Sequence, residues 1–134
     1  MATVLVDSNV LLDVLTDDPV WGERSARALA ECGDRHLLAI NSVVYAEVSV
    51  GFERIEDVDA ALPYAMIERL QIPWEAAFLA AKCFLRYRRY GGTRTAPLPD
   101  FFIGAHAAVE NLTLLTRDVS RYKTYFPRVR LLVP

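Results

Sequence analysis

Near its start the chain reads Thr3-Val4-Leu5-Val6-Asp7-Ser8-Asn9, a short apolar run that ends in a carboxylate. The apolar run predicts a buried strand over residues 3–6, and the spacing of apolar residues that follows predicts a helix over residues 8–15. Asp7 would then lie at the carboxyl end of a buried strand, where open α/β sheets bind their ligands. Because aspartate is also a common N-cap, a purely structural role for Asp7 stays open.

Short β-branched runs and longer amphipathic segments alternate along the rest of the chain. This alternation predicts one α/β domain, residues 1–134, with a largely parallel sheet. Further strands are expected at residues 36–40, 112–115 and 129–133, and helices at 21–32, 42–52, 57–70, 75–90 and 100–110. Gly33 and Gly91 are expected to end two of these helices.

The composition is that of an ordinary globular domain, with 134 residues of which 53% are hydrophobic and 24% charged. The N-terminus has no basic start, and no apolar run approaches the ~20 residues that a membrane-spanning helix needs. We therefore expect a soluble, cytoplasmic protein without membrane contact. Cys32 and Cys83 stand singly in helical patterns, which favours buried free thiols over a disulfide.

The charges are distributed unevenly, although the net charge is only −2. Residues 1–81 hold five Arg and fourteen Asp or Glu, whereas residues 82–134 hold ten Lys or Arg against three acidic residues, a net charge of +7. Such a division can place a positive surface beside an acidic pocket, as a nuclease requires. The simpler interpretation is a set of solvated helix faces.

Glu47 lies on the apolar stripe of its predicted helix, because Val43, Val44 and Val48 share its face. A buried carboxylate is costly unless it has a cation, hydrogen bonds or a raised pKa. A metal ion would satisfy this requirement. Alternatively, Glu47 lies at the rim of the stripe and reaches water.

Two further aspartates occupy similar positions. Asp100 opens the helix at 100–110, and Asp118 follows the strand at 112–115 in the way that Asp7 follows the first strand. In a parallel sheet the loops that carry Asp7 and Asp118 would converge. Converging carboxylates repel by about 4 kcal/mol per close pair without a cation. Ligands that are all oxygen suit Mg²⁺ or Mn²⁺ and do not suit zinc.

Taken together, these residues resemble the PIN-domain family, and most closely the VapC-type toxins, over essentially the whole chain. The resemblance is carried by Val6-Asp7-Ser8-Asn9, Asn41-Ser42-Val43-Val44-Tyr45-Ala46-Glu47, Pro99-Asp100-Phe101-Phe102-Ile103-Gly104-Ala105-His106-Ala107 and Leu114-Leu115-Thr116-Arg117-Asp118. It implies a three-layer sandwich, with a parallel central sheet and helices on both faces. It further implies a homodimeric, Mg²⁺-dependent endoribonuclease that hydrolyses RNA with a metal-activated water and is inhibited by a cognate antitoxin protein.

The resemblance also assigns roles to individual residues. Asp7 and Asp100 would be the firmest metal ligands, with Glu47 and Asp118 completing the acidic site directly or through water. Asn9 and Thr116 would support these ligands. Some relatives have a further aspartate after the position of Asp118, where this chain reads Val119-Ser120-Arg121-Tyr122. The number of metal ions, one or two, therefore stays open.

Candidate RNA contacts come from two basic stretches near the predicted site. Arginines can bind phosphates and tyrosines can stack on unpaired bases. The candidates are Arg86, Arg88, Arg89 and Arg117, with Tyr87, Tyr90, Tyr122 and Tyr125. The same residues at helical spacing are equally compatible with packing against the protein's own surface.

Three alternative functions remain. One is a PIN-type RNA-processing nuclease outside any toxin pair, and another is a catalytically idle interaction module whose carboxylates only cap helices. A small-molecule phosphotransferase is disfavoured, because Asp7-Ser8-Asn9 lacks a second aspartate and the chain has no Gly-rich phosphate loop.

Overall fold

A five-stranded parallel sheet organises the computed structural model of the protein, which describes residues 2–95 and 98–134. The strand order is β3-β2-β1-β4-β5, and all four neighbouring pairs are parallel. The strands are β1 (Thr3–Val6), β2 (Leu37–Asn41), β3 (Ile67–Leu70), β4 (Thr113–Leu115) and β5 (Leu131–Leu132). The helices are α1 (Ser8–Leu15), α2 (Gly22–Arg35), α3 (Ser42–Ser49), α4 (Ile55–Ala61), α5 (Trp74–Arg89), α6 (Pro99–Val109) and α7 (Val119–Tyr125).

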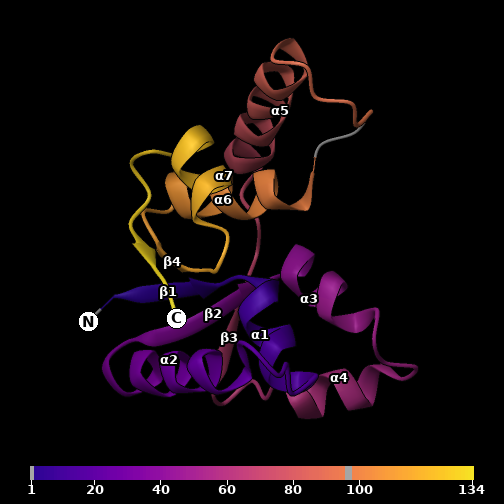
Figure 1. Ribbon diagram of the computed structural model, residues 1–134, viewed down its shortest axis with the longest axis vertical. Coiled ribbons are helices and arrows are strands. Elements are labelled where there is room, and N and C mark those ends of the chain that lie inside the picture. Colours follow the sequence, from indigo (N-terminus) through magenta and orange to yellow (C-terminus); the bar gives the residue numbers. More distant parts are fainter. Residues whose placement is uncertain (1, 96–97) are drawn as a thin grey trace.

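β1 is the central strand, and its apolar residues explain that position. Val4, Leu5 and Val6 are completely buried, as expected for a strand that is covered on both faces. Helices α1 and α2 lie on one side of the sheet, and α6 and α7 lie on the other (Figure 1). The three-layer α/β fold predicted from the sequence is therefore confirmed.

The predicted helix over residues 57–70 is wrong in its second half. Helix α4 ends at Ala61, and Ile67–Leu70 forms the edge strand β3, which pairs with β2. Pro63 provides the physical reason, because a proline inside a helix removes a hydrogen bond and clashes with the preceding turn. Within residues 67–70 only Ile67 is buried, and a strand at the edge of the sheet is enough to bury it.

Two further differences concern helix ends. Gly33 was expected to stop a helix, but it lies inside α2, which continues to Arg35. Gly91 follows α5 with a φ of +91°, so its predicted role at a helix end is confirmed. Helix α7 was not predicted at all, because its seven residues provide too short a pattern.

Both cysteines are buried and free, as predicted. Over residues 2–95 and 98–134, none of the helices combines the length and the apolar character needed to cross a membrane.

Helix α6 approaches its neighbours closely because it carries small residues. A β-carbon added at Gly104 would lie 2.3 Å from the ring of Phe126, a side chain that is only 4% exposed. Gly104 therefore makes room for the aromatic residue that follows α7. This contact helps to fix α7, and with it the residues around Asp118, against α6.

We expect Gly104→Ala to lower the free energy of unfolding by about 1 to 3 kcal/mol, because the buried Phe126 ring has to shift. The matched control is Gly33→Ala in α2, where the nearest side-chain atom is 3.6 Å from the added carbon. That control should be neutral or stabilising by up to about 1 kcal/mol, since alanine favours helix over glycine. Urea unfolding measures both values, and equal effects of the two substitutions would contradict the proposed packing.

Candidate acidic site at the carboxyl edge of the sheet

Asp7 lies directly after β1, and its side chain is only 2% exposed. Its Oδ1 accepts a hydrogen bond from the Ser8 N–H at 2.8 Å. Its Oδ2 accepts hydrogen bonds from the Thr116 hydroxyl at 2.8 Å and from the Tyr122 hydroxyl at 2.9 Å. Burial raises the pKa of Asp7, and these three hydrogen bonds oppose that rise. Asp7 is therefore both the N-cap of α1 and a buried carboxylate at the sheet edge.

Thr116 and Asn9 lie beside Asp7, where the resemblance placed supporting groups. Thr116 is fully buried, and its Oγ1 also accepts the N–H of Asp118 at 3.0 Å. The Asn9 amide nitrogen lies 3.4 Å from Asp7 Oδ2, and its oxygen accepts the N–H of Arg117 at 3.2 Å. These bonds hold the end of β4 and the turn that carries Asp118 against the start of α1.

Glu47 is held at the rim of the apolar stripe on α3. It is half-buried beside Val44 and Val48, and its Oε1 accepts a hydrogen bond from the Ser8 hydroxyl at 2.8 Å. Burial raises the pKa of Glu47 most, the Ser8 bond lowers it, and the nearby Asp7 charge raises it further. Ser8 thus joins two of the predicted site carboxylates, one through its backbone N–H and one through its hydroxyl.

Asp100 lies in the first turn of α6, whose N-cap residue, Leu98, makes no side-chain capping hydrogen bond. Its nearest cation is Arg121, whose Nε is 3.6 Å from Oδ2. Burial, followed by the charge of Asp7, raises the pKa of Asp100 to about 6; Arg121 lowers it, and Asp118 and Glu47 raise it further. The fields of the other three carboxylates therefore converge on Asp100.

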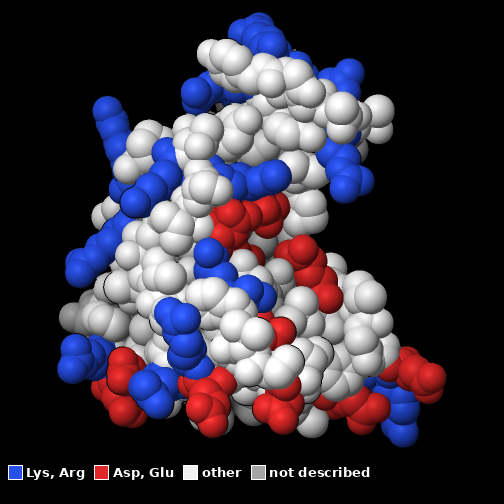
Figure 2. Space-filling model, viewed as in Figure 1, with Lys and Arg blue, Asp and Glu red and all other residues white. Residues whose placement is uncertain are grey.

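The four carboxylates lie near enough for the charges of Asp7, Asp118 and Glu47 to act on Asp100. In Figure 2, acidic side chains gather in a recess between the upper part of the molecule, which corresponds to α5–α7 in Figure 1, and its lower part, while Lys and Arg occupy much of the upper part. No three His, Cys, Asp or Glu side chains are placed to hold one ion together, within residues 2–95 and 98–134.

The donor set nevertheless suits a hard divalent cation. Magnesium commonly keeps several of its waters and binds through only one or two carboxylates. A raised pKa at Asp100 also means that negative charge there lacks compensation, which a cation would supply. The cysteine sulfurs that softer metal ions prefer lie elsewhere, because Cys32 and Cys83 belong to the hydrophobic core cluster.

His106 is a buried residue of α6 that hydrogen-bonds to Asn41. The Asn41 Oδ1 accepts the N–H groups of Val43 and Val44, so its amide nitrogen must be the donor to His106 Nδ1 at 3.1 Å. His106 is therefore neutral, with its proton on Nε2, and burial lowers its pKa. The pair ties the start of α3 to α6, the helices that carry Glu47 and Asp100.

Three residues contact the site carboxylates without a sequence pattern that assigns them this role: Ser8, Arg121 and Tyr122. Tyr122 was expected to stack on RNA, but it is completely buried and donates its hydroxyl to Asp7. That expectation is wrong, because a buried ring has no free face. The bond joins residues 115 positions apart, so no local pattern marks it.

The predicted RNA-binding arginines have different surroundings. Arg86, Arg88 and Arg89 are exposed in the last turn of α5. Arg117 forms a two-pronged ion pair with the buried Asp13, with both N–O distances at 2.8 Å, and its guanidinium lies over the ring of Trp21. Arg117 thus links the turn after β4 to α1 through its ion pair with Asp13.

Comparison with known proteins places this fold in a family. The PIN domain family matches residues 4–127. Among solved structures, the chain is similar to VapBC2 from Rickettsia felis bound to a DNA fragment from their promoter, with a TM-score of 0.74 and 20% identity over 98% of each chain. It is also similar to VapBC-1 from nontypeable Haemophilus influenzae, with a TM-score of 0.72 and 17% identity over 98% of this chain and 97% of that one. FitAcB from Neisseria gonorrhoeae has a TM-score of 0.64 and 20% identity over 96% of each chain.

At these identities the structural similarities establish the fold alone, and no curated protein matches the sequence. The family match spans nearly the whole chain, and the acidic residues lie at the carboxyl edge of its sheet. The protein therefore belongs to the PIN-domain family, whose members are generally nucleases.

Proposed function

We propose that the protein is a divalent-metal-dependent endoribonuclease and the toxin of a type II toxin–antitoxin pair. The observation that carries the nuclease proposal is the acidic hollow, in which burial and three other carboxylates raise the pKa of Asp100 to about 6. A fold gains no stability from such a group of charges, which suggests that it is kept for a cation. The toxin assignment is supported by the VapBC and FitAcB structures that the chain resembles.

In this proposal Asp7 and Asp100 hold Mg²⁺ or Mn²⁺ directly, while Glu47 and Asp118 act directly or through water. The bound ion would lower the pKa of water and offset charge on the phosphoryl oxygens. Thr116 and Tyr122 orient the Asp7 carboxylate by donating to the same oxygen, Oδ2. The other oxygen, Oδ1, accepts from the Ser8 N–H at 2.8 Å, and the Ser8 hydroxyl lies 3.5 Å from it.

RNA is the proposed substrate because a basic surface accompanies the acidic hollow. Arg86, Arg88 and Arg89 are exposed in the last turn of α5, and α5 lies in the upper part of the molecule (Figure 1), where Lys and Arg can attract phosphates. The proposed protein partners are a cognate antitoxin and a second copy of this chain. A PIN-type RNA-processing nuclease remains the second candidate, and a short antitoxin gene beside this one would separate the two.

We expect Asp7→Asn and Asp100→Asn each to abolish RNA cleavage while the protein still folds, because each removes a charged ligand. The matched control is Glu75→Gln, which neutralises an exposed carboxylate at the start of α5. The assay is incubation with total cellular RNA, with Mg²⁺ or with a chelator. Discrete fragments should appear only with the metal and only for the wild type and the control. Full activity in both site variants would refute the catalytic assignment.

Asp100 should also make stability depend on pH when no divalent cation is present. Because its folded pKa of about 6 lies above the usual 3.8, the neutral form favours folding, and this contribution is lost as the pH rises through 6. From pH 5 to pH 8 the loss is up to about 1.4 kcal/mol, reduced by the partial exposure of the side chain.

The measurement is urea unfolding in chelator at both pH values, comparing wild type with Asp100→Asn. The raised pKa values of Asp7 and Glu47 change stability in the same direction and the lowered pKa of His106 in the opposite one. The difference between the two proteins therefore reports Asp100 together with its coupling to the other carboxylates. Added Mg²⁺ should restore stability to the wild type at pH 8. Identical pH dependence in the two proteins would show that Asp100 does not carry this charge.

The double variant Arg88→Glu with Arg89→Glu should weaken RNA binding and flatten its dependence on salt, because phosphate contacts release counterions. For single-stranded RNA the slope of log K against log salt should fall by about 0.7 for each lost contact. Binding is measured in the Asp7→Asn protein so that RNA is not cut. Arg27→Glu, an exposed arginine of α2, tests the effect of charge reversal alone. An equal effect of both changes would argue against a basic RNA surface on α5.

A further inference from the structure

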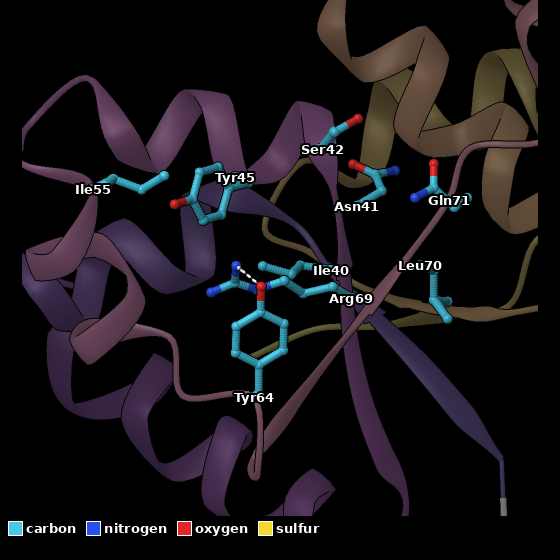
Figure 3. Close-up of a pocket in the computed structure, with 9 residues that line it drawn as sticks. All are labelled: Ile40, Asn41, Ser42, Tyr45, Ile55, Tyr64, Arg69, Leu70 and Gln71. Atoms are coloured by element: carbon cyan, nitrogen blue, oxygen red, sulfur yellow. Dashed lines mark hydrogen bonds between the residues drawn. The ribbon is translucent and has the colours of Figure 1, made fainter.

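A second hollow lies beside the acidic site, at the carboxyl ends of β2 and β3. Its volume is about 500 Å³. Its lining comes from the ends of the two strands, from α3 and from the residues before β3: Ile40, Asn41, Ser42, Tyr45, Ile55, Tyr64, Arg69, Leu70 and Gln71 (Figure 3). None of the four site carboxylates belongs to this lining. Because β2 is the neighbour of β1, the pocket lies at the same edge of the sheet as Asp7.

The pocket contains an arginine that is already neutralised. The Arg69 Nη2 donates to Asp59 at 2.8 Å, and its Nη1 donates to the Tyr64 hydroxyl at 2.7 Å. Its guanidinium also lies over the rings of Tyr64, at 3.7 Å, and Tyr45, at 4.8 Å. Asp59 offsets the charge of this arginine, and its unpartnered nitrogen, Nε, is buried and out of reach of an anion in the pocket. The pocket therefore does not suit a phosphate group.

The groups that remain available to a ligand are planar or uncharged. Tyr64 is 67% exposed and presents an aromatic ring that Arg69 supports from one side. Ser42 and Gln71 are exposed polar side chains, and Figure 3 shows them across the pocket from Tyr64 and Arg69. An aromatic surface facing hydroxyl and amide groups matches a flat ligand with hydrogen-bonding edges.

We propose that this pocket binds an unpaired base of the RNA strand whose phosphodiester lies at the acidic hollow, with Tyr64 stacking on the base and Gln71 or Ser42 contacting its edge. The inference rests on the proposed ribonuclease function. Neighbouring strands are about 4.8 Å apart, so the ends of β2 and β3 lie roughly 5 to 10 Å from the end of β1. A nucleotide adjacent to the cleaved bond can span that distance, which makes the pocket a determinant of base preference.

The test measures binding separately from cleavage. The probes are fluorescent single-stranded RNA hexamers that differ at one position, which is A, C, G or U, and the protein is Asp7→Asn in chelator. Loss of one stacked base should weaken binding of the preferred hexamer by about tenfold in Tyr64→Ala and reduce the differences among the four bases. Tyr64→Phe keeps the aromatic ring and should retain most of the hexamer affinity and most of the base preference. Trp74→Ala removes an exposed aromatic side chain of α5, outside the pocket, and should change neither.

Unchanged hexamer binding and base preference in Tyr64→Ala would overturn the proposal. It would also be overturned if Tyr64→Ala weakened binding of an antitoxin protein while RNA binding stayed the same, because the pocket would then serve a protein partner. Cleavage of total RNA by the wild type is measured in parallel. If the wild type cuts RNA and the pocket variants bind it normally, only the base-binding inference is refuted. If the wild type neither binds nor cuts RNA, the proposed ribonuclease function is refuted as well.

Discussion

The buried carboxylate of Asp7 constrains the structure more than any other group. A charged side chain at the end of the central strand is expensive to remove from water, so the fold must surround it with donors. These donors come from α1, the end of β4 and α7, at Ser8, Thr116 and Tyr122. The β1–β4 pairing and the packing of α7 against α6 bring them to one place. The strand pairing and helix packing that define the fold therefore also assemble the hydrogen bonds to Asp7.

The same carboxylates interact unfavourably with one another and with their desolvated surroundings at this edge of the sheet. Asp7 and Glu47 are desolvated by their surroundings, and Asp100 receives the field of the other acidic groups with only Arg121 to oppose it. A protein selected for stability alone would replace such residues with neutral ones. Their presence, together with membership of a nuclease family, agrees with a site that is completed by a cation. The adjacent tyrosine-lined pocket has its charges balanced internally, so the two hollows attract different chemistry.

The sequence could predict whatever depends on local pattern. The buried run at Val4–Val6 identified β1, and its junction with Asp7 located the site edge. Prediction failed where a tertiary contact decides the outcome: Ile67–Leu70 is a strand because β2 offers an open edge, and Pro63 ends the helical pattern before it. Likewise, the hydroxyl bonds from Ser8 to Glu47 and from Tyr122 to Asp7 join distant residues, which one sequence without coordinates cannot reveal.

The span of these contacts also bears on how the molecule is made. Asp7 lies near the beginning of the chain, whereas Thr116 and Tyr122 are among its last residues, and β1 pairs with β4 through Val4 and Thr113. Contacts of such long sequence separation cannot form until both ends are present. During synthesis, the surroundings of Asp7 are therefore complete only after α7 has left the ribosome. A prematurely terminated chain that lacked α7 would leave Asp7 without the hydroxyl of Tyr122, one of its three donors.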